Sequence, residues 1–225
     1  MKLLVTALLL SFHVKLVASL VAPAAFSADK NKQDVAGAIS DGAFLRAPHN
    51  FGPASSRDSV LFTAERPGNP KGDKLAPVDD ESVFEWIEFM RNENQISHVL
   101  ALLDENEFSN YEPSGLLRMY EQGGLKYTVQ SMSDANACEN VCHLLMRAEA
   151  DNERVVAHCT GGIGRAGRVA GGWLSYRYGL SPEKAADEVL LQAKLNGVTR
   201  NCDAEKLAQW MERFRGTSAN QMLQP

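Results

Sequence analysis

Segments with hydrophobic residues at the spacing of a helix face alternate along the chain with short, mostly apolar segments of strand length. In the stretch 80–92, Val83, Trp86, Ile87 and Met90 recur at the spacing of one helix face. The stretch 97–103 is a mostly apolar run with the length of a buried strand. A helix at 80–92 followed by a strand at 97–103 is therefore predicted.

The same alternation continues to the end of the chain. It predicts further strands at 59–63, 125–130 and 154–158, and further helices at 113–122, 137–150, 165–178 and 203–214. Another helix is expected to begin at Pro182, because Ser181 is a good helix cap and proline is favoured at the first helical position. Strands that alternate with helices are typical of an α/β protein. We expect a mainly parallel central sheet flanked by helices.

The beginning of the chain lacks these periods. Residues 1–19 combine Lys2, an apolar stretch at 3–10 and small residues before residue 20, which is the layout of a signal peptide. A membrane anchor is the alternative, but Ser11 and Lys15 interrupt the run well short of the roughly 20 apolar residues that a span needs. Entry into the secretory pathway is therefore expected.

Residues 20–58 are rich in small and polar residues and are predicted to be a transit-like or flexible leader. The stretch 20–26 resembles the bipartite plastid presequences of algae with complex plastids, although Leu20 stands where an aromatic residue is usual. This resemblance favours such a plastid over secretion. One catalytic domain is expected at 59–216, followed by a flexible tail at 217–225.

Composition narrows the possible partners. The chain has 225 residues, 44% of them hydrophobic, which is enough for one well-buried domain. Its net charge of −5 gives no general attraction for nucleic acid or anionic lipid, so neither nucleic acid nor stable membrane insertion after processing is expected. The oligomeric state stays open.

The four cysteines are too sparse for a disulfide scaffold. Cys138 and Cys142 are four residues apart and share a face of a predicted helix. No histidine pair accompanies them, so core packing is expected rather than metal binding, and a redox partnership with Cys159 stays open. No role is assigned to Cys202.

The sequence HCTGGIGR at 158–165 stands where a buried strand gives way to a helix. Its glycines let successive N–H groups point into a concavity at the helix N-terminus, which binds anions. Arg165 can bind two phosphate oxygens with its planar fork, and the same positive field favours the thiolate of Cys159, a ready nucleophile. The expected phosphate-binding residues are Thr160, Gly161, Gly162, Ile163, Gly164 and Arg165.

This stretch fits the C-x5-R signature of protein tyrosine and dual-specificity phosphatases, and the resemblance covers roughly residues 60–214. It extends to the segments 65–68, 102–105 with Tyr111, and 199–201. The chain resembles the compact members of microbial and kinase-associated type. Rhodanese-like sulfur transferases are a distant alternative, because their cysteine loops usually lack this glycine pattern.

The resemblance implies a dual-specificity-phosphatase-like fold and a phosphocysteine intermediate, with no metal and no cofactor. It also implies that Arg200 and Asn201 lie beside the site and help to position water, and that His158 and Ala166 flank the loop. The general acid should follow a neighbouring strand, which favours Asp134, with Asp104 as the competitor.

The chain departs from this family at Ala166, where most members carry a serine or threonine hydroxyl that assists hydrolysis of the phosphoenzyme. Alanine also occurs there in plastid glucan phosphatases. Phosphorylated protein is the leading substrate class, because Thr160 and Ile163 are uncharged. A phosphoglucan phosphatase and a catalytically weak, phosphate-binding pseudophosphatase are the alternatives.

Overall fold

The computed structural model describes residues 47–68 and 76–221. The expected signal peptide and most of the leader lie outside these residues, as does the end of the expected tail. Within the described ranges, no helix has the length and apolar composition needed to cross a membrane.

Five strands of the described part of the chain form one sheet in the order β1-β2-β5-β3-β4. The strands are β1 (Gly52–Pro53), β2 (Leu61–Glu65), β3 (His98–Ala101), β4 (Lys126–Val129) and β5 (Val155–Cys159). All neighbouring pairs are parallel except β1 with β2. The expected mainly parallel sheet is therefore confirmed, and β5, which leads into the phosphate-binding sequence, lies at its centre.

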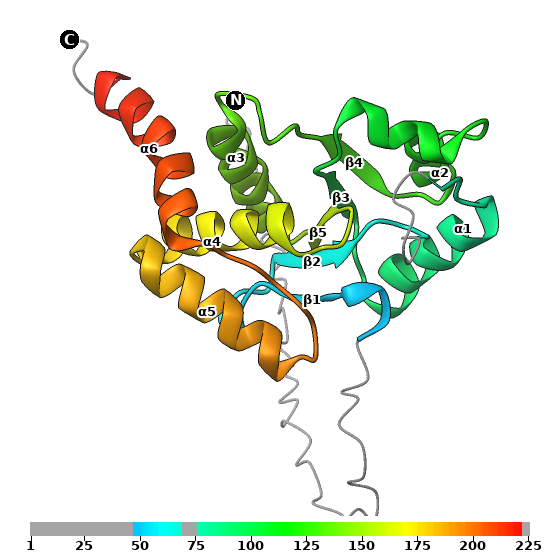
Figure 1. Cartoon of the computed structure of the whole chain (residues 1–225), viewed down its shortest axis with the longest axis horizontal. Coiled ribbons are helices and arrows are strands. Elements are labelled where there is room, and N and C mark those ends of the chain that lie inside the picture. The colour runs from blue at the N-terminus through cyan, green and yellow to red at the C-terminus, as the bar shows by residue number, and fades with distance from the viewer. Residues whose placement is uncertain (1–46, 69–75, 222–225) are drawn as a thin grey trace, which may run out of the picture. The chain divides into compact units, whose positions relative to one another are not determined.

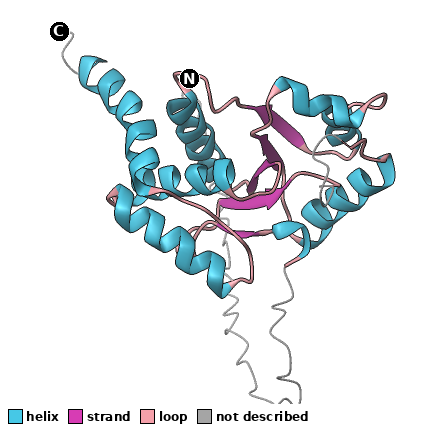
Figure 2. Cartoon of the chain, viewed as in Figure 1, coloured by secondary structure: helices cyan, strands magenta, loops and turns pink. Residues whose placement is uncertain are grey.

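Helices cover both faces of the sheet (Figures 1 and 2). They are α1 (Asp80–Glu88), α2 (Leu116–Gln122), α3 (Ala137–Ala150), α4 (Gly164–Tyr178), α5 (Pro182–Leu195) and α6 (Ala204–Gln221). Helices α1 and α2 pack on one face, and α3 to α6 pack on the other. Each face has its own apolar core, and Trp86 and Trp173 are fully buried in the two cores.

Local signals in the sequence explain several boundaries. The side chain of Asp79 accepts a hydrogen bond from Ser82 N and starts α1, and that of Ser181 accepts one from Lys184 N and starts α5. Gly179, with φ 67°, ends α4 in the left-handed conformation that glycine adopts without strain. Helix α6 continues to Gln221, past the expected end at 214 and into the expected tail.

Short irregular helices are where the structure departs from the predicted elements: one forms the end of the helix expected at 80–92, and another lies where no helix was expected. A π-helical turn, Phe89–Glu93, follows α1, and a 3-10 helix, Glu105–Tyr111, follows β3. The stretch 105–111 contains few apolar residues and has no regular period, so hydrophobic patterning gave no signal for it. This 3-10 helix lies at the carboxyl end of β3, beside the loop that follows β5.

The domain starts earlier than residue 59. A 3-10 turn, Pro48–Asn50, and strand β1 pack on β2, and Asp58 accepts hydrogen bonds from Leu61 N at 2.7 Å and Trp173 Nε1 at 2.8 Å. Residues 47–53, which we call the N-terminal arm, join the fold through hydrogen bonds of Asn50 with distant residues and through Phe51, which stacks on Phe62. The sequence analysis places them in the leader because they are short and show no hydrophobic period. Hydrophobic periodicity does not register such contacts.

Candidate active site

The sequence 158–165 forms a loop between the carboxyl end of β5 and the first turn of α4, as expected (Figure 1). Gly162 lies in the left-handed region with φ 67°. A Cβ at this position would come within 2.4 Å of the carbonyl carbon of Ala64, so the loop can pass this close to β2 only with glycine here. The N–H groups of the loop lie at the N-terminus of α4, where an anion is favoured.

Cys159 is the last residue of β5, and its side chain is almost fully buried. It is a free cysteine, as are the other three. Burial works to lower the pKa of Arg165, but the ion pair with Glu107 raises it above its ordinary value, and the charges of Cys159 and Asp104 add to this effect. Cys159 at the end of β5 and Arg165 in the first turn of α4 lie at the two ends of one short loop.

Glu107 holds the guanidinium of Arg165, and the sequence analysis did not identify this residue. Nη1 donates to Oε2 at 2.6 Å and Nη2 donates to Oε1 at 2.9 Å, which gives a two-pronged pair. Arg165 also donates to Leu102 O at 2.6 Å and to the Thr160 hydroxyl at 2.6 Å. The fork is thereby fixed against the wall of the site.

The carboxylate of Glu107 is itself held in place. The Thr160 hydroxyl and Asp104 N donate to it, the latter at 2.9 Å. Burial acts to raise the pKa of Glu107, but the hydrogen bonds from Arg165 and Thr160 outweigh burial and lower it to about 2. Glu107 is therefore ionised at neutral pH and keeps a full negative charge against the guanidinium.

The two candidate acids lie at neighbouring strand ends. Asp104 follows β3 and is 57% exposed, and its Oδ2 is 3.5 Å from Arg165 Nη1. Asp134 lies in the exposed loop after β4, where it accepts hydrogen bonds from Asn136 N at 2.8 Å and Gln130 Nε2 at 3.4 Å. Ser131, in the Asp134 loop, donates to Asp104 at 3.4 Å. Both carboxylates thus belong to the same end of the sheet, and of the two only Asp104 has a described contact with Arg165.

His158 lies behind the loop, on the opposite face of β5 from Cys159. Its Nε2 is 2.9 Å from the hydroxyl of Tyr120, and its ring packs edge-on against Trp86. Complete burial, with a further contribution from the positive charge of Arg165, lowers the pKa of His158 to about 3. The imidazole is therefore neutral and serves as a fixed support for the strand end.

Arg200 and Asn201 lie next to each other in the chain but contact different parts of the structure. Arg200 is buried, and its guanidinium donates to Thr63 Oγ1 at 2.7 Å, to Thr63 O at 2.8 Å and to Asn50 O at 2.6 Å. Asn201 contacts the loop through its main chain, with N donating to Ile163 O at 3.1 Å. Asn201 therefore contacts the loop directly, whereas Arg200 binds β2 and Asn50, and the implied role of both residues in placing water stays a prediction.

The remaining predicted residues lie in the cores around the loop. Ala166, in the first turn of α4, is fully buried. Cys138 and Cys142 are buried, as core packing requires. Cys202, for which no role was predicted, is buried too, and burial raises its pKa to about 11. Within residues 47–68 and 76–221, no cluster of His, Cys, Asp and Glu could hold a metal ion.

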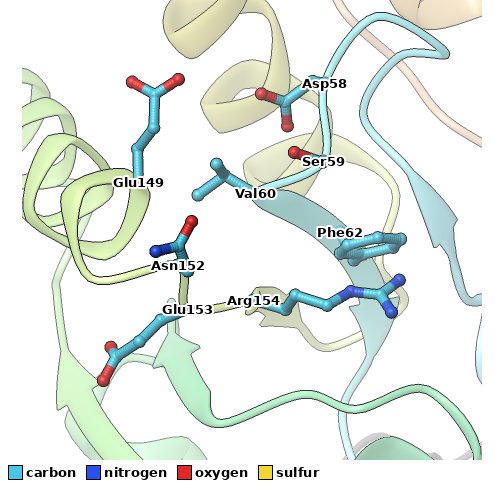
Figure 3. Close-up of a pocket in the computed structure, with 8 residues that line it drawn as sticks. All are labelled: Asp58, Ser59, Val60, Phe62, Glu149, Asn152, Glu153 and Arg154. Carbon is cyan, nitrogen blue, oxygen red and sulfur yellow. The ribbon is translucent and has the colours of Figure 1, made fainter. Parts of the chain in front are cut away.

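A cavity of about 480 Å³ lies at the opposite end of the sheet (Figure 3). Arg154 lies there with its guanidinium carbon 4.3 Å from the centre of the Phe62 ring. Carboxylates of the cavity wall are already paired, for example Glu149 with Arg177 and Glu153 with Lys126. Since this cavity is at the amino ends of β2 and β5, it is separate from the 158–165 loop at their carboxyl ends.

No protein-family model and no curated protein match the sequence. Solved structures do match the fold. PTPMT1 aligns over 76% of this chain and 99% of its own length, with 12% identity and a TM-score of 0.54. Tk-PTP in its active form aligns over 69% and 92%, with 18% identity and a TM-score of 0.50. The kinase associated phosphatase, with its catalytic-site cysteine replaced by serine, aligns over 68% and 86%, with 20% identity and a TM-score of 0.51.

These similarities confirm the predicted fold, which is that of the cysteine-based tyrosine and dual-specificity phosphatases. At such low identities they bear on the fold alone. The chemistry of the site depends on its own residues.

Proposed function

We propose that the chain hydrolyses phosphomonoesters through a phosphocysteine intermediate, as a cysteine-dependent protein tyrosine or dual-specificity phosphatase. One observation carries the proposal. Cys159 and Arg165 stand at the two ends of a glycine-rich loop that joins the central strand to a helix N-terminus, and Glu107 fixes the Arg165 fork from the side. This arrangement suits a tetrahedral oxyanion that must be bound next to a thiolate.

The first step would be attack of the Cys159 sulfur on phosphorus. An S–P bond forms while the bond to the leaving oxygen breaks, and the loop N–H groups and Arg165 stabilise the charge on the remaining phosphate oxygens. The leaving oxygen takes a proton from a carboxylic acid. Asp134 is proposed as this acid, and Asp104 is the alternative because it follows the adjacent strand and contacts Arg165.

The second step would be hydrolysis of the phosphocysteine. The ionised acid takes a proton from water, the water oxygen bonds to phosphorus, and the thiolate of Cys159 leaves. A side-chain hydroxyl directly after Arg165 would stabilise the departing thiolate, but Ala166 stands there and its side chain cannot donate a hydrogen bond. Hydrolysis of the intermediate is therefore proposed as the slow step.

A phosphorylated protein is the proposed substrate. Thr160 and Ile163 give the loop no positive side chain beyond Arg165, and the carboxylates of Asp104 and Glu107 stand beside the clamp. Ligands with several phosphate groups would meet repulsion there. A single phosphate on a protein side chain fits this charge pattern better.

The test compares the purified protein with its Cys159→Ser variant on an aryl phosphate, phosphotyrosine and phosphothreonine peptides, and a phosphoglucan. The wild type is expected to release phosphate from the aryl phosphate and at least one peptide, and Cys159→Ser is expected to be inactive. Equal rates for the two proteins would refute the proposal. Phosphate release from the phosphoglucan alone would mean that the substrate is a phosphoglucan and not a protein. The proposed phosphocysteine mechanism would then still stand.

A further inference from the structure

The phosphate loop is bound from outside through its carbonyl groups. Three groups from other segments donate to these carbonyls. Arg66 N donates to Cys159 O at 2.9 Å, Asn50 Nδ2 to Gly161 O at 2.9 Å, and Asn201 N to Ile163 O at 3.1 Å. In a trans peptide group the C=O and the following N–H point in opposite directions. Each of these bonds therefore turns the next N–H of the loop toward the concave side, where a phosphate would bind.

Asn50 differs from the other two donors because it acts through its side chain. Its Nδ2 donates to Gly161 O at 2.9 Å and to Thr199 O at 3.1 Å, and its Oδ1 accepts from Thr199 N at 2.8 Å. Both amide hydrogens and the amide oxygen are thus used. The residue is fully buried, so these bonds form without competition from water.

The backbone at Asn50 is also held firmly. Its φ of 48° lies in the left-handed region, which asparagine tolerates better than most residues. Its carbonyl oxygen accepts from Arg200 at 2.6 Å, and earlier in the arm Ala47 N donates to Gly197 O at 3.1 Å. The arm therefore presents the Asn50 amide to the loop from a fixed position.

We propose that Asn50 is a positioning residue for phosphate binding. By holding the carbonyl of Gly161 outward, it aims the N–H of Gly162 into the site and keeps the loop in its anion-binding form. Asn50 acts through Gly161 and does not touch the phosphate. The catalytic consequence rests on the proposed function, whereas the effect on loop geometry can be measured by anion binding alone.

Two variants remove the contact in different ways. Asn50→Gly deletes the amide but keeps a residue that adopts positive φ without strain. Asn50→Asp keeps the acceptor for Thr199 N but places a carboxylate against the carbonyl oxygens of Gly161 and Thr199. The matched control is His49→Gly, because His49 precedes Asn50 with φ 53° and packs against Phe89 instead of the loop.

Three readouts are measured on the full chain: binding of inorganic phosphate, the pH midpoint for alkylation of Cys159 by iodoacetamide, and the midpoint of thermal unfolding. Asn50→Gly is expected to weaken phosphate binding roughly three- to tenfold, the effect of one neutral hydrogen bond. It should also move the alkylation midpoint to higher pH. Asn50→Asp should have the larger effect, and His49→Gly should leave binding and alkylation unchanged.

The inference fails if Asn50→Gly binds phosphate and reacts with iodoacetamide as the wild type does. If Asn50→Gly does not fold, phosphate binding and alkylation of Asn50→Asp test the inference in its place, since aspartate also tolerates positive φ. A purely structural role would lower the unfolding midpoint while leaving the alkylation midpoint in place, and that result also refutes the inference. Failure of the proposed function would be seen separately, as equal turnover by wild type and Cys159→Ser.

Discussion

The guanidinium of Arg165 and the carboxylate of Glu107 form a two-pronged ion pair, with nitrogen to oxygen distances of 2.6 and 2.9 Å. Parallel hydrogen bonds of this kind fix the plane of the guanidinium as well as its position. Because the pair is partly buried, solvent screens it less than a surface pair. The orientation of the Arg165 guanidinium therefore depends on a residue from the 3-10 helix after β3.

Replacing Glu107 with glutamine keeps the shape of the side chain and removes its charge. We expect kcat/KM for an aryl phosphate to fall roughly 10- to 100-fold, because a hydrogen bond between charged groups contributes about 1.5–3 kcal/mol. The control is Glu105→Gln, on an exposed residue of the same 3-10 helix, which should keep wild-type activity. Faster turnover by Glu107→Gln would instead mean that Glu107 competes with phosphate for the clamp.

The general acid can be identified from the leaving group. Asp134→Asn should slow hydrolysis of an alkyl phosphate by about 10²- to 10⁴-fold and have little effect on an activated aryl phosphate, whose leaving oxygen needs no proton. Asp104→Asn is measured in parallel. The same selective loss in Asp104→Asn, with Asp134→Asn unaffected, would transfer the role to Asp104.

Ala166→Ser should restore the missing hydroxyl. Under the proposed mechanism the wild type shows a rapid burst of leaving-group release followed by slow turnover, and the variant should raise the slow rate by about tenfold, the effect of one charged hydrogen bond. Rapid-mixing kinetics with an aryl phosphate separates the two phases. Ala170→Ser, one turn further along α4 and equally buried, is the control that should leave the slow rate unchanged.

His158 should make the stability of the protein depend on pH. Its pKa is lowered from 6.5 to about 3 in the folded state, so between these values the unfolded chain binds a proton that the folded chain excludes. Stability is therefore full above about pH 6.5 and falls as the pH drops toward 3, with a slope of up to about 1.4 kcal/mol per pH unit from this residue.

The measurement is urea unfolding between pH 7 and pH 4.5 for the wild type and His158→Gln. The variant is expected to be less stable at pH 7 but to lose less stability on acidification. His49 and His98 titrate in both proteins, so the difference between the two slopes isolates His158. If the stability of the two proteins fell with the same slope against pH, His158 could not be a buried, neutral imidazole in the folded state.

The elements that hydrophobic periodicity controls could be predicted from the sequence. Helix α3 at Ala137–Ala150 has the predicted bounds, and β5 is within one residue of its prediction. The positions of Cys159 and Arg165 at the two ends of the loop follow from the motif, because a strand, a glycine turn and a helix place them with only local geometry.

The residues that were missed depend on contacts between distant segments. Glu107 lies in a polar stretch without a period, and it reaches Arg165 only because β3 and β5 are neighbours in the sheet. Asn50 lies in a stretch that composition assigned to the leader, and its partners at Gly161 and Thr199 are more than a hundred residues away. Such polar pairings leave no mark on the sequence near either partner.

The N-terminal arm also limits how a precursor of this protein could mature. A protease that cut at the sequence-based boundary before residue 59 would release Asn50, β1 and Asp58 together. The buried N–H of Trp173 would lose its acceptor, and the carbonyl of Gly161 its donor. If the expected leader is removed, we therefore predict that the cut falls upstream of Ala47 and leaves the whole arm in place.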